Sequence, residues 1–274
     1  KQKTILALKI IAISFLAILI ALFVFRNEVL KQTIAKVSFK MASEYNSTFT
    51  VKEASFVGLS GLRFSEIVLA PKNADTLFRI HKMKTSVNLW RLLVGDIQLG
   101  TLEIENGYVQ LVKNKKGRNF DAFLKKDETK TAENKKRDYA KVAYRLISKV
   151  LNFVPTDMKV ENLAFRLNDN GKKTTINFQK LSLVNKQLET SVQVKTKAFT
   201  QRIRITGFAD PRNKTADIRF FNIDTGAIKV PYLDERFNLK SSFDSIRINI
   251  QNIDKSGSEL HLDGFASIAN LMIN

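Results

Sequence analysis

Alternation of apolar and polar residues is the feature that most limits what this chain can fold into. From about Phe49 onward, short runs place an apolar side chain at every second position, and turn signals such as Asp169-Asn-Gly171 recur about every ten to fifteen residues. Because successive side chains of a strand point to opposite faces, this pattern is typical of a sheet with one apolar and one solvated face. The sequence therefore predicts a mainly β body, an elongated, curved antiparallel sheet shaped like a groove, with a few short helices.

The alternation is most regular in the second half of the chain. An apolar sheet face must be covered, either by a second packed layer or by something else that excludes water. Both interpretations stay open from the sequence: a filled core, or an open face that holds acyl chains. In the second case the lipid-facing candidates are Ile176, Phe178, Val192, Val194, Ile203, Ile205, Ile246, Ile248 and Ile250.

Residues 1–26 have the composition of a membrane anchor. The apolar stretch from Thr4 to Phe25 would span roughly 33 Å as a helix at about 1.5 Å per residue, enough for a hydrocarbon core of about 30 Å. Its one charge, Lys9, lies close enough to the start to reach the headgroups. The stretch ends in bulky residues rather than a small-residue cleavage site, which favours an uncleaved transmembrane helix. Residues on this predicted anchor include Leu8, Ile11, Phe15, Leu19 and Phe23.

The rest of the chain divides by composition and periodicity. Residues 27–48 have helical spacing, and this juxtamembrane helix either packs on the β body or lies as an amphipathic collar on the membrane. A first β section is predicted over 49–112, interrupted by a short helix from Ser86 to Val94. A Lys-rich mobile loop over 113–138, a helix over 139–155 and a second β section over 156–274 follow.

A faint internal repeat links the two β sections. Leu102-Glu-Ile-Glu-Asn-Gly-Tyr-Val-Gln-Leu111 and Met158-Lys-Val-Glu-Asn-Leu-Ala-Phe-Arg-Leu167 share a hydrophobe-Glu-Asn core followed by an alternating strand. The repeat suggests a sheet that is extended by similar units.

The formal net charge of +19 is concentrated near the anchor and in the central loop. It amounts to +6 over residues 1–40, zero over 41–112, +8 over 113–149 and +5 over 150–274. A nucleic-acid-binding protein usually carries its basic residues on a folded face, so this distribution argues against nucleic acid and for membrane phospholipid as a partner. Lysines flank the apolar stretch on both sides, and a short tail before a long body favours a cytoplasmic N-terminus.

Motifs for catalysis are missing from the sequence. It has no Cys, no HExxH, no P-loop and no GxGxxG, and its two histidines, His81 and His261, each alternate within a strand. The adjacent carboxylates Asp234 and Glu235 are expected to be solvated on a turn. We therefore expect no catalytic, cofactor or metal site here, and no enzyme activity in this stretch of chain.

Both ends of the sequence have the character of cut ends. It starts at Lys1 without a Met, and it stops at Asn274 directly after the apolar run Ile268-Ala-Asn-Leu-Met-Ile273. We expect the chain to be a piece of a longer protein.

An ordered set of motifs in the first half resembles a known family. After the apolar stretch come Leu59-Ser-Gly-Leu-Arg-Phe-Ser-Glu-Ile-Val-Leu69, Val87-Asn-Leu-Trp-Arg-Leu-Leu-Val-Gly95, the strand pattern from Asp96 to Leu111, and Gly117-Arg-Asn-Phe120. Over residues 1–125 this is similar to the amino-terminal region of the AsmA-like proteins of Gram-negative bacteria. The resemblance implies a single-pass inner-membrane protein with its bulk in the periplasm as a β-groove. It also implies a role in moving phospholipid toward the outer membrane and in cell-envelope biogenesis.

Two alternatives to lipid handling remain open. Some Bacteroidota envelope proteins resemble this sequence at their start and carry a peptidoglycan glycosyltransferase domain behind it. The glycosyltransferase signature Glu-Asp-x-x-Phe-x-x-His-x-Gly is absent here, so this stretch would be the enzyme's non-catalytic N-terminal region. The other alternative is a structural subunit of a membrane assembly, which contacts protein partners in the envelope through the span and the Lys-rich loop.

Overall fold

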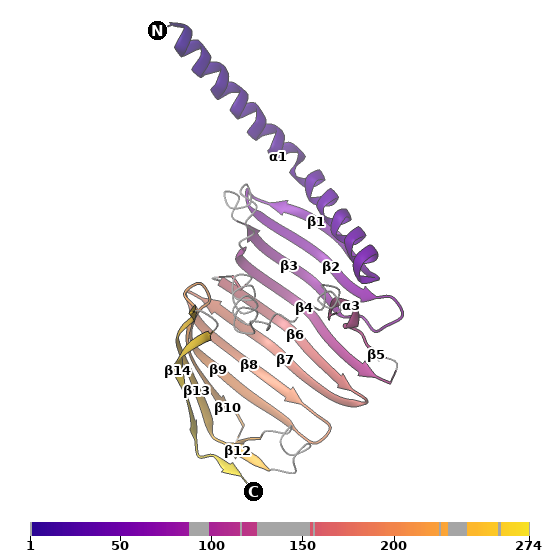
Figure 1. Ribbon diagram of the computed structural model, residues 1–274, viewed down its shortest axis with the longest axis vertical. Coiled ribbons are helices and arrows are strands. Elements are labelled where there is room, and N and C mark those ends of the chain that lie inside the picture. The colour runs from indigo at the N-terminus through magenta and orange to yellow at the C-terminus, as the bar shows by residue number, and fades with distance from the viewer. Residues whose placement is uncertain are drawn as a thin grey trace.

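The computed structural model is mainly β, with a long N-terminal helix leading into one large sheet (Figure 1). It describes residues 2–87, 99–115, 117–124, 154–155, 157–224, 226–229, 240–256 and 259–273, without the side chains of 2–22, 87, 99, 124, 255–256 and 259–260. The elements are α1 (Gln2–Tyr45), β1 (Ser47–Val57), β2 (Gly61–Pro71), β3 (Phe78–Val87), β4 (Leu99–Asn114), β5 (Gly117–Arg118), α3 (Asp121–Leu124), β6 (Asp157–Asp169), β7 (Lys172–Val184), β8 (Gln187–Lys195), β9 (Thr200–Asp210), β10 (Thr215–Asn222), β11 (Ile228–Lys229), β12 (Ser241–Phe243), β13 (Ser245–Ser256), β14 (Glu259–Ala269) and β15 (Met272–Ile273).

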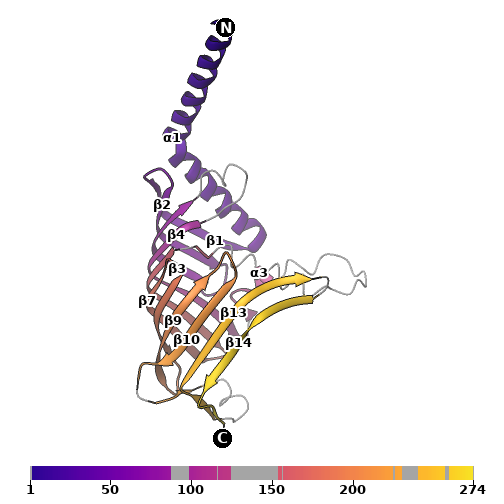
Figure 2. The same ribbon diagram turned by 90° about the vertical axis from the view of Figure 1, so that its left-hand side faces the viewer.

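The main sheet follows chain order with few exceptions. Its strands lie in the order β1-β2-β3-β4-β6-β7-β8-β9-β10-β13-β14, with β5 paired to the end of β4. The sheet is strongly curved, and β13 and β14 turn across from the first strands like the far wall of a trough (Figure 2). The expectation of a mainly β chain with an extended, curved sheet is confirmed in this coarse form.

The expectation of a wholly antiparallel sheet is wrong at one junction. Strands β4 and β6 run parallel, from Thr101 opposite Asp157 to Lys113 opposite Asp169, so the sheet is mixed. The chain therefore returns to the same end of the sheet between these strands, as any parallel connection requires. The two copies of the faint repeat are these two strands, and they pair in register, with Leu102 opposite Met158 and Leu111 opposite Leu167.

The second half of α1 covers the edge strand β1. The helix runs antiparallel to β1 and hydrogen-bonds its backbone at both ends: Phe56 N donates to Asn27 Oδ1 at 3.1 Å, and Ser38 Oγ donates to Phe49 O at 2.9 Å. Covering an edge strand in this way prevents pairing with another chain. Leu30, Ile34 and Met41 are half-buried on this side, consistent with the packing interpretation of residues 27–48.

Several predicted boundaries differ from the observed ones. The helix ends at Tyr45 rather than 48, because Asn46 adopts a left-handed conformation (φ 46°) and β1 begins at Ser47. Ser86, where a short helix was predicted to begin, is part of β3 instead, and its hydroxyl accepts the Thr101 N–H at 2.9 Å. The predicted loop over 113–138 begins with the end of β4, then β5 and α3. Residues 88–98 and 125–153, and with them most of the predicted helices over 86–94 and 139–155, lie outside the described residues.

A line of irregular positions crosses the first half of the sheet and bends it. Glu66, Asn106 and Asn162 on β2, β4 and β6 have φ of 47°, 56° and 54°. At each of these positions one residue pair is missing from the pairing with the neighbouring strands. His81 lies at the same position on β3. On either side of this crease the inward side chains lie three residues apart instead of two, so two successive residues point outward. Such bulge-like irregularities increase strand bending and twist.

Polar side chains connect the crease on the outer surface. His81 Nδ1 lies 2.5 Å from Glu66 Oε1, and Asn162 Nδ2 donates to Asn106 Oδ1 at 3.1 Å. Asn tolerates the left-handed region better than most residues, which is why it suits two of these strands. The hydrophobe-Glu-Asn core of the repeat is therefore the sequence of the bend itself.

Replacing Asn162 tests this account of the crease. We expect Asn162→Val to lower the free energy of unfolding by about 1–2 kcal/mol, because a β-branched residue is strained at positive φ. Asn162→Gly should cost less, since glycine adopts this conformation readily and loses only the hydrogen bond to Asn106. Urea denaturation followed by circular dichroism measures both; equal losses for the two variants would show that the backbone conformation is not the cause.

Candidate functional site

One face of the main sheet is apolar from the first strand to the last. Residues directly opposite each other in a ladder point to the same face, so the register traces rows of side chains across the strands. One row is apolar at ten of its eleven positions: Ala54, Phe64, Met83, Ile104, Val160, Leu181, Thr190, Ile205, Phe220, Ile246 and Ile268. At about 4.8 Å between strands, the row is roughly 48 Å long. We call this surface the apolar face.

Parallel rows widen the apolar face. The next row lies closer to the β2–β3 turn. It consists of Val51, Ile67, Ile80, Gly107, Leu163, Phe178, Val192, Ile203 and Asn222. The rings of Phe165 and Phe178 meet edge to face, with centroids 5.7 Å apart. The face is thus several side chains wide over most of the sheet.

All nine predicted lipid-facing residues lie on the apolar face. The ladders align Ile176 with Val194, Phe178 with Val192 and Ile203, and Ile205, through Phe220, with Ile246. Only Val192 is buried, at 5 % exposure. The other eight, Ile176, Phe178, Val194, Ile203, Ile205, Ile246, Ile248 and Ile250, are half-buried. The site that the sequence suggested is therefore a single continuous surface.

Sequence reasoning missed the part of the face contributed by β1 to β6. Phe64, Met83, Ile104, Val160 and Leu163 belong to the same rows as the predicted residues. Their strands were predicted, but the crease shifts the alternation by one residue within each strand. The apolar residues before and after the crease in one strand therefore do not follow a single period of two. The signal that could have found them is the repeated hydrophobe-Glu-Asn core, since the shift occurs at that point.

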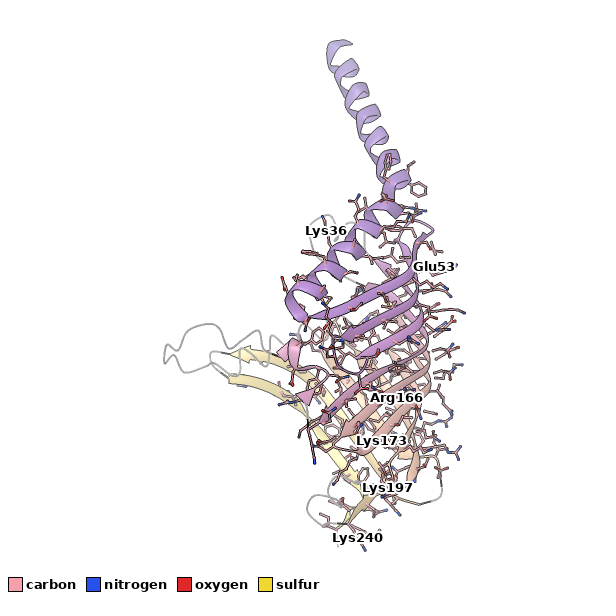
Figure 3. All side chains as sticks on the ribbon, turned by 90° about the vertical axis from the view of Figure 1, so that its right-hand side faces the viewer. Lys36, Glu53, Arg166, Lys173, Lys197 and Lys240 are labelled. Atoms are coloured by element: carbon pink, nitrogen blue, oxygen red, sulfur yellow. The ribbon has the colours of Figure 1, made fainter. Side chains whose placement is uncertain are left out.

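The curvature places the apolar face on the concave side. Side chains of the opposite, charged face project from the convex side of the sheet, Glu53 among them (Figure 3). Glu53 lies in the ladder row of Ser65, Lys82 and Glu105, on the charged face. Water-exposed polar groups are thus outside, and apolar groups that are half-buried or, like Ile67, Val160 and Val192, buried are inside.

Two glycines let neighbouring strands approach closely along the apolar face. A Cβ on Gly207 would lie 2.0 Å from Asp217 O, and one on Gly264 would lie 2.1 Å from Asn249 O. No other residue fits there without moving the backbone, because real Cβ contacts are never so short. These close approaches lie in the second half of the sheet, beyond the crease.

No described element forms a second layer across the apolar face. The extensive contacts among described elements run between neighbouring strands and between α1 and β1. At one end, Gln201 Oε1 accepts the Lys229 N–H at 2.9 Å and joins the small sheet β11-β12-β15 to β9. Ile228 and Phe243 of this small sheet are buried, at 4 % and 8 % exposure.

Ion pairs fasten the strands on the convex face. Lys82 and Lys84 bridge to Glu105 and Glu103 at 3.1 and 3.2 Å. The hydrogen bond from Lys82 and its charge lower the pKa of the Glu105 carboxyl. Further along the sheet, the pKa of the aspartate is also lowered in three pairs: Lys186–Asp210, Arg202–Asp224 and Arg247–Asp217. In each case the main cause is the side-chain hydrogen bond from the basic partner.

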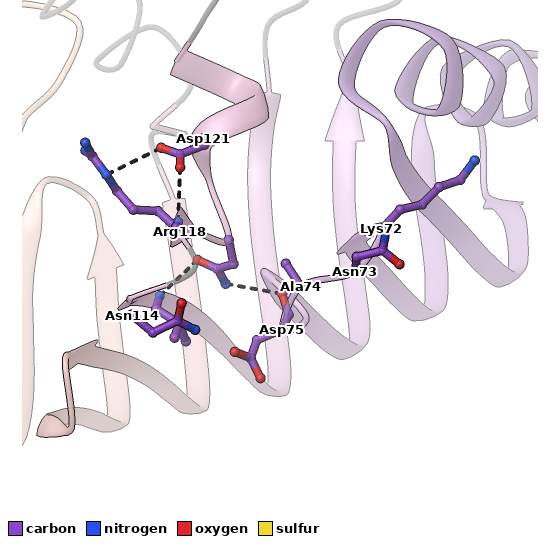
Figure 4. Close-up of a pocket in the computed structure, with 10 residues that line it drawn as sticks. Lys72, Asn73, Ala74, Asp75, Asn114, Arg118 and Asp121 are labelled. Carbon is purple, nitrogen blue, oxygen red and sulfur yellow. Dashed lines mark hydrogen bonds and ion pairs between the residues drawn. The ribbon is translucent and has the colours of Figure 1, made fainter.

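A pocket of about 610 Å³ lies off the apolar face, between the β2–β3 turn and the segment around β5 (Figure 4). Asn119, 3 % exposed, accepts the Val112 N–H at 2.9 Å and donates to the carbonyl oxygens of Gln110 and Asp75 at 2.9 and 3.3 Å. Arg118 pairs with Asp121 beside it. These groups satisfy one another, so the Gly117-Arg-Asn-Phe120 motif serves to clamp two turns together.

The predicted anchor stays a prediction. Leu8, Ile11, Phe15 and Leu19 lie on α1 where side chains are not described, and Phe23 is 50 % exposed. Among the residues that the structure describes, no helix is long and apolar enough to cross a membrane.

The remaining polar candidates do not converge. His81 is exposed in its pair with Glu66, His261 is exposed on β14, and Asp234 and Glu235 lie outside the described residues. Within the described ranges, no three acidic or histidine side chains are grouped closely enough to hold a metal ion.

The Arg247–Asp217 pair should make the stability of the fold depend on pH. Two short hydrogen bonds, 2.8 Å from Nε to Oδ1 and 2.6 Å from Nη2 to Oδ2, join β13 to β10. Since the pair lowers the pKa of Asp217 in the folded state, its stabilisation is complete above the ordinary aspartate pKa and is lost as pH falls through the lowered value. Asp217→Asn should therefore lower the urea midpoint at pH 7 and have a smaller effect at pH 3. Asp75→Asn, at an exposed turn, is the control; a loss that does not depend on pH would contradict the assignment.

Comparison with protein-family models, with curated proteins and with solved structures finds no match for this chain.

Proposed function

We propose that this chain is a membrane-anchored lipid-handling protein of the AsmA-like type. In this proposal residues 1–26 form a single transmembrane span in the bacterial inner membrane, and the sheet projects into the periplasm. The apolar face holds the acyl chains of phospholipid on its way toward the outer membrane, as part of envelope biogenesis. The observation that carries the proposal is the continuous apolar face on the concave side of a curved sheet.

The energetics favour a ligand on this face. Apolar surface left in water costs about 25 cal/mol for each Å², and soluble monomers seldom leave contiguous apolar patches larger than a few hundred Å² in water. Most predicted lipid-facing side chains are only half-buried by the rest of the chain. A bound apolar ligand would remove that exposed surface from water.

Acyl chains suit the chemistry and the size of the face. They carry no hydrogen-bonding groups, and the rows offer almost none: Thr190, the one polar member of the long row, donates its hydroxyl to Lys180 O at 2.9 Å. An acyl chain spans about half of a hydrocarbon core of about 30 Å. A row of roughly 48 Å is therefore long enough for acyl chains to lie along it. A headgroup could remain at the open side, in water.

Photocrosslinking on β8 tests the proposal. Val194 lies on the apolar face, and its neighbour Gln193 points to the opposite face. With the photoreactive residue p-benzoyl-phenylalanine at either position of the full chain in Gram-negative cells, we expect phospholipid adducts at 194 and none at 193. Mass spectrometry of the purified, irradiated protein measures both.

The alternatives predict other outcomes of the same experiment. Adducts only to protein at position 194 would indicate a structural subunit whose partner covers the face. Absence of adducts at 194, together with a purified chain that carries no lipid, would leave a non-catalytic spacer in front of a further domain. Equal lipid adducts at 193 and 194 would also contradict the proposal, because the lipid would not distinguish the two faces.

A further inference from the structure

The turn between β1 and β2 is fastened to α1 at the residue where the predicted span ends. Arg26 Nη1 donates to Gly58 O at 2.5 Å, and the next helix residue, Asn27, accepts the Phe56 N–H. The Arg26 guanidinium also lies 3.9 Å from the Phe23 ring centroid and 5.3 Å from that of Phe56. These contacts fix the turn at the level of Arg26, directly beyond the apolar stretch that ends at Phe25. In Figure 1 the turn lies at the end of the body from which α1 departs.

The fastened turn presents large apolar side chains to water. Leu59 is 73 % exposed and Val57 43 %. A Cβ placed on Gly58 would have no atom within 4 Å, so the turn projects into open space. On the adjacent helix Phe23, Val24 and Phe25 are 50 %, 64 % and 62 % exposed. Two segments that are far apart in sequence thus form one exposed apolar surface.

The charges around this surface match a bilayer interface. Arg26 reaches from α1 to the apolar turn, and the exposed Arg63 lies two residues after the start of β2. Lys31 follows on α1 and pairs with Glu28 at 3.8 Å, so the basic side chains outnumber the one acidic residue. Basic side chains next to apolar and aromatic ones are typical of headgroup depth, where the guanidinium reaches phosphate and the apolar groups reach the acyl region.

We propose that the turn Val57–Ser60 inserts into the leaflet beside the anchor, with Leu59 among the acyl chains. The inference rests on the proposed function and names the point where lipid reaches the apolar face. Phe56 and Leu62 flank the turn and pair with each other as the first members of a row that continues through Thr85 to Leu102. An acyl chain next to Leu59 would therefore meet the start of the apolar face at Phe56, beside the Arg26 guanidinium.

Depth-dependent fluorescence quenching tests the inference. The chain has no Cys, so Leu59→Cys places a single environment-sensitive fluorophore on the turn. The full chain is reconstituted in vesicles of phosphatidylcholine and phosphatidylglycerol that carry bromine on their acyl chains. Two matched controls carry the same probe: Asp75→Cys in the turn at the other end of β2, and Arg212→Cys in the β9–β10 turn. We expect quenching several-fold stronger at 59 than at 75 or 212.

The outcomes separate this inference from the proposed function. If the chain resists carbonate extraction from the vesicles but the probe at 59 is quenched no more than at 75, the anchor stands and the insertion of the turn is wrong. If the chain does not associate with the vesicles at all, the proposed function fails first. Equal, strong quenching at all three positions means that the whole body lies on the membrane, which also overturns the inference. Should Leu59→Cys fail to fold, Val57→Cys reports on the same turn.

Discussion

The structure depends on one constraint: every strand must place its apolar side chains on the same side of a single sheet. Backbone pairing enforces this, because opposite residues in a ladder share a face and a slip of one residue would move a whole set of side chains into water. The row from Ala54 to Ile268 shows how far the constraint holds, across eleven strands that include one parallel pair. The charged side chains are thereby collected on the convex face, where Lys82–Glu105 and Arg247–Asp217 link neighbouring strands.

The crease reconciles that constraint with curvature. A regular sheet twists but does not fold into a trough, and positive-φ residues at matching positions on β2, β4 and β6 allow the strands to bend together. The change of alternation that this causes is the same in each strand, so the apolar face remains continuous across it. Repetition of the hydrophobe-Glu-Asn core on β4 and β6 is thus a requirement of neighbouring strands that must bend at the same place.

The proposals join three parts of the molecule. The predicted span would hold the chain in a membrane, the turn at Leu59 would contact the leaflet, and the apolar face would receive the acyl chain. Arg26 links the first two, since it contacts both Phe23 of the helix and Gly58 of the turn. Phe56 and Leu62 link the turn to the face. Each link is a contact or a pairing between described residues, whereas the membrane and the lipid are inferred.

Much of this protein could be predicted from its sequence, because strand periodicity is a local property. The alternation in residues 176–205 and 246–250 was sufficient to identify the β class, the turns and nine side chains of the apolar face. Only the tertiary structure decided the parallel pairing of β4 with β6, the contribution of β1 to β6 to the face, and the contact of the β1–β2 turn with Arg26. These depend on register between strands and on packing between distant segments. Neither leaves a periodic signal within one strand, so local sequence could not specify them.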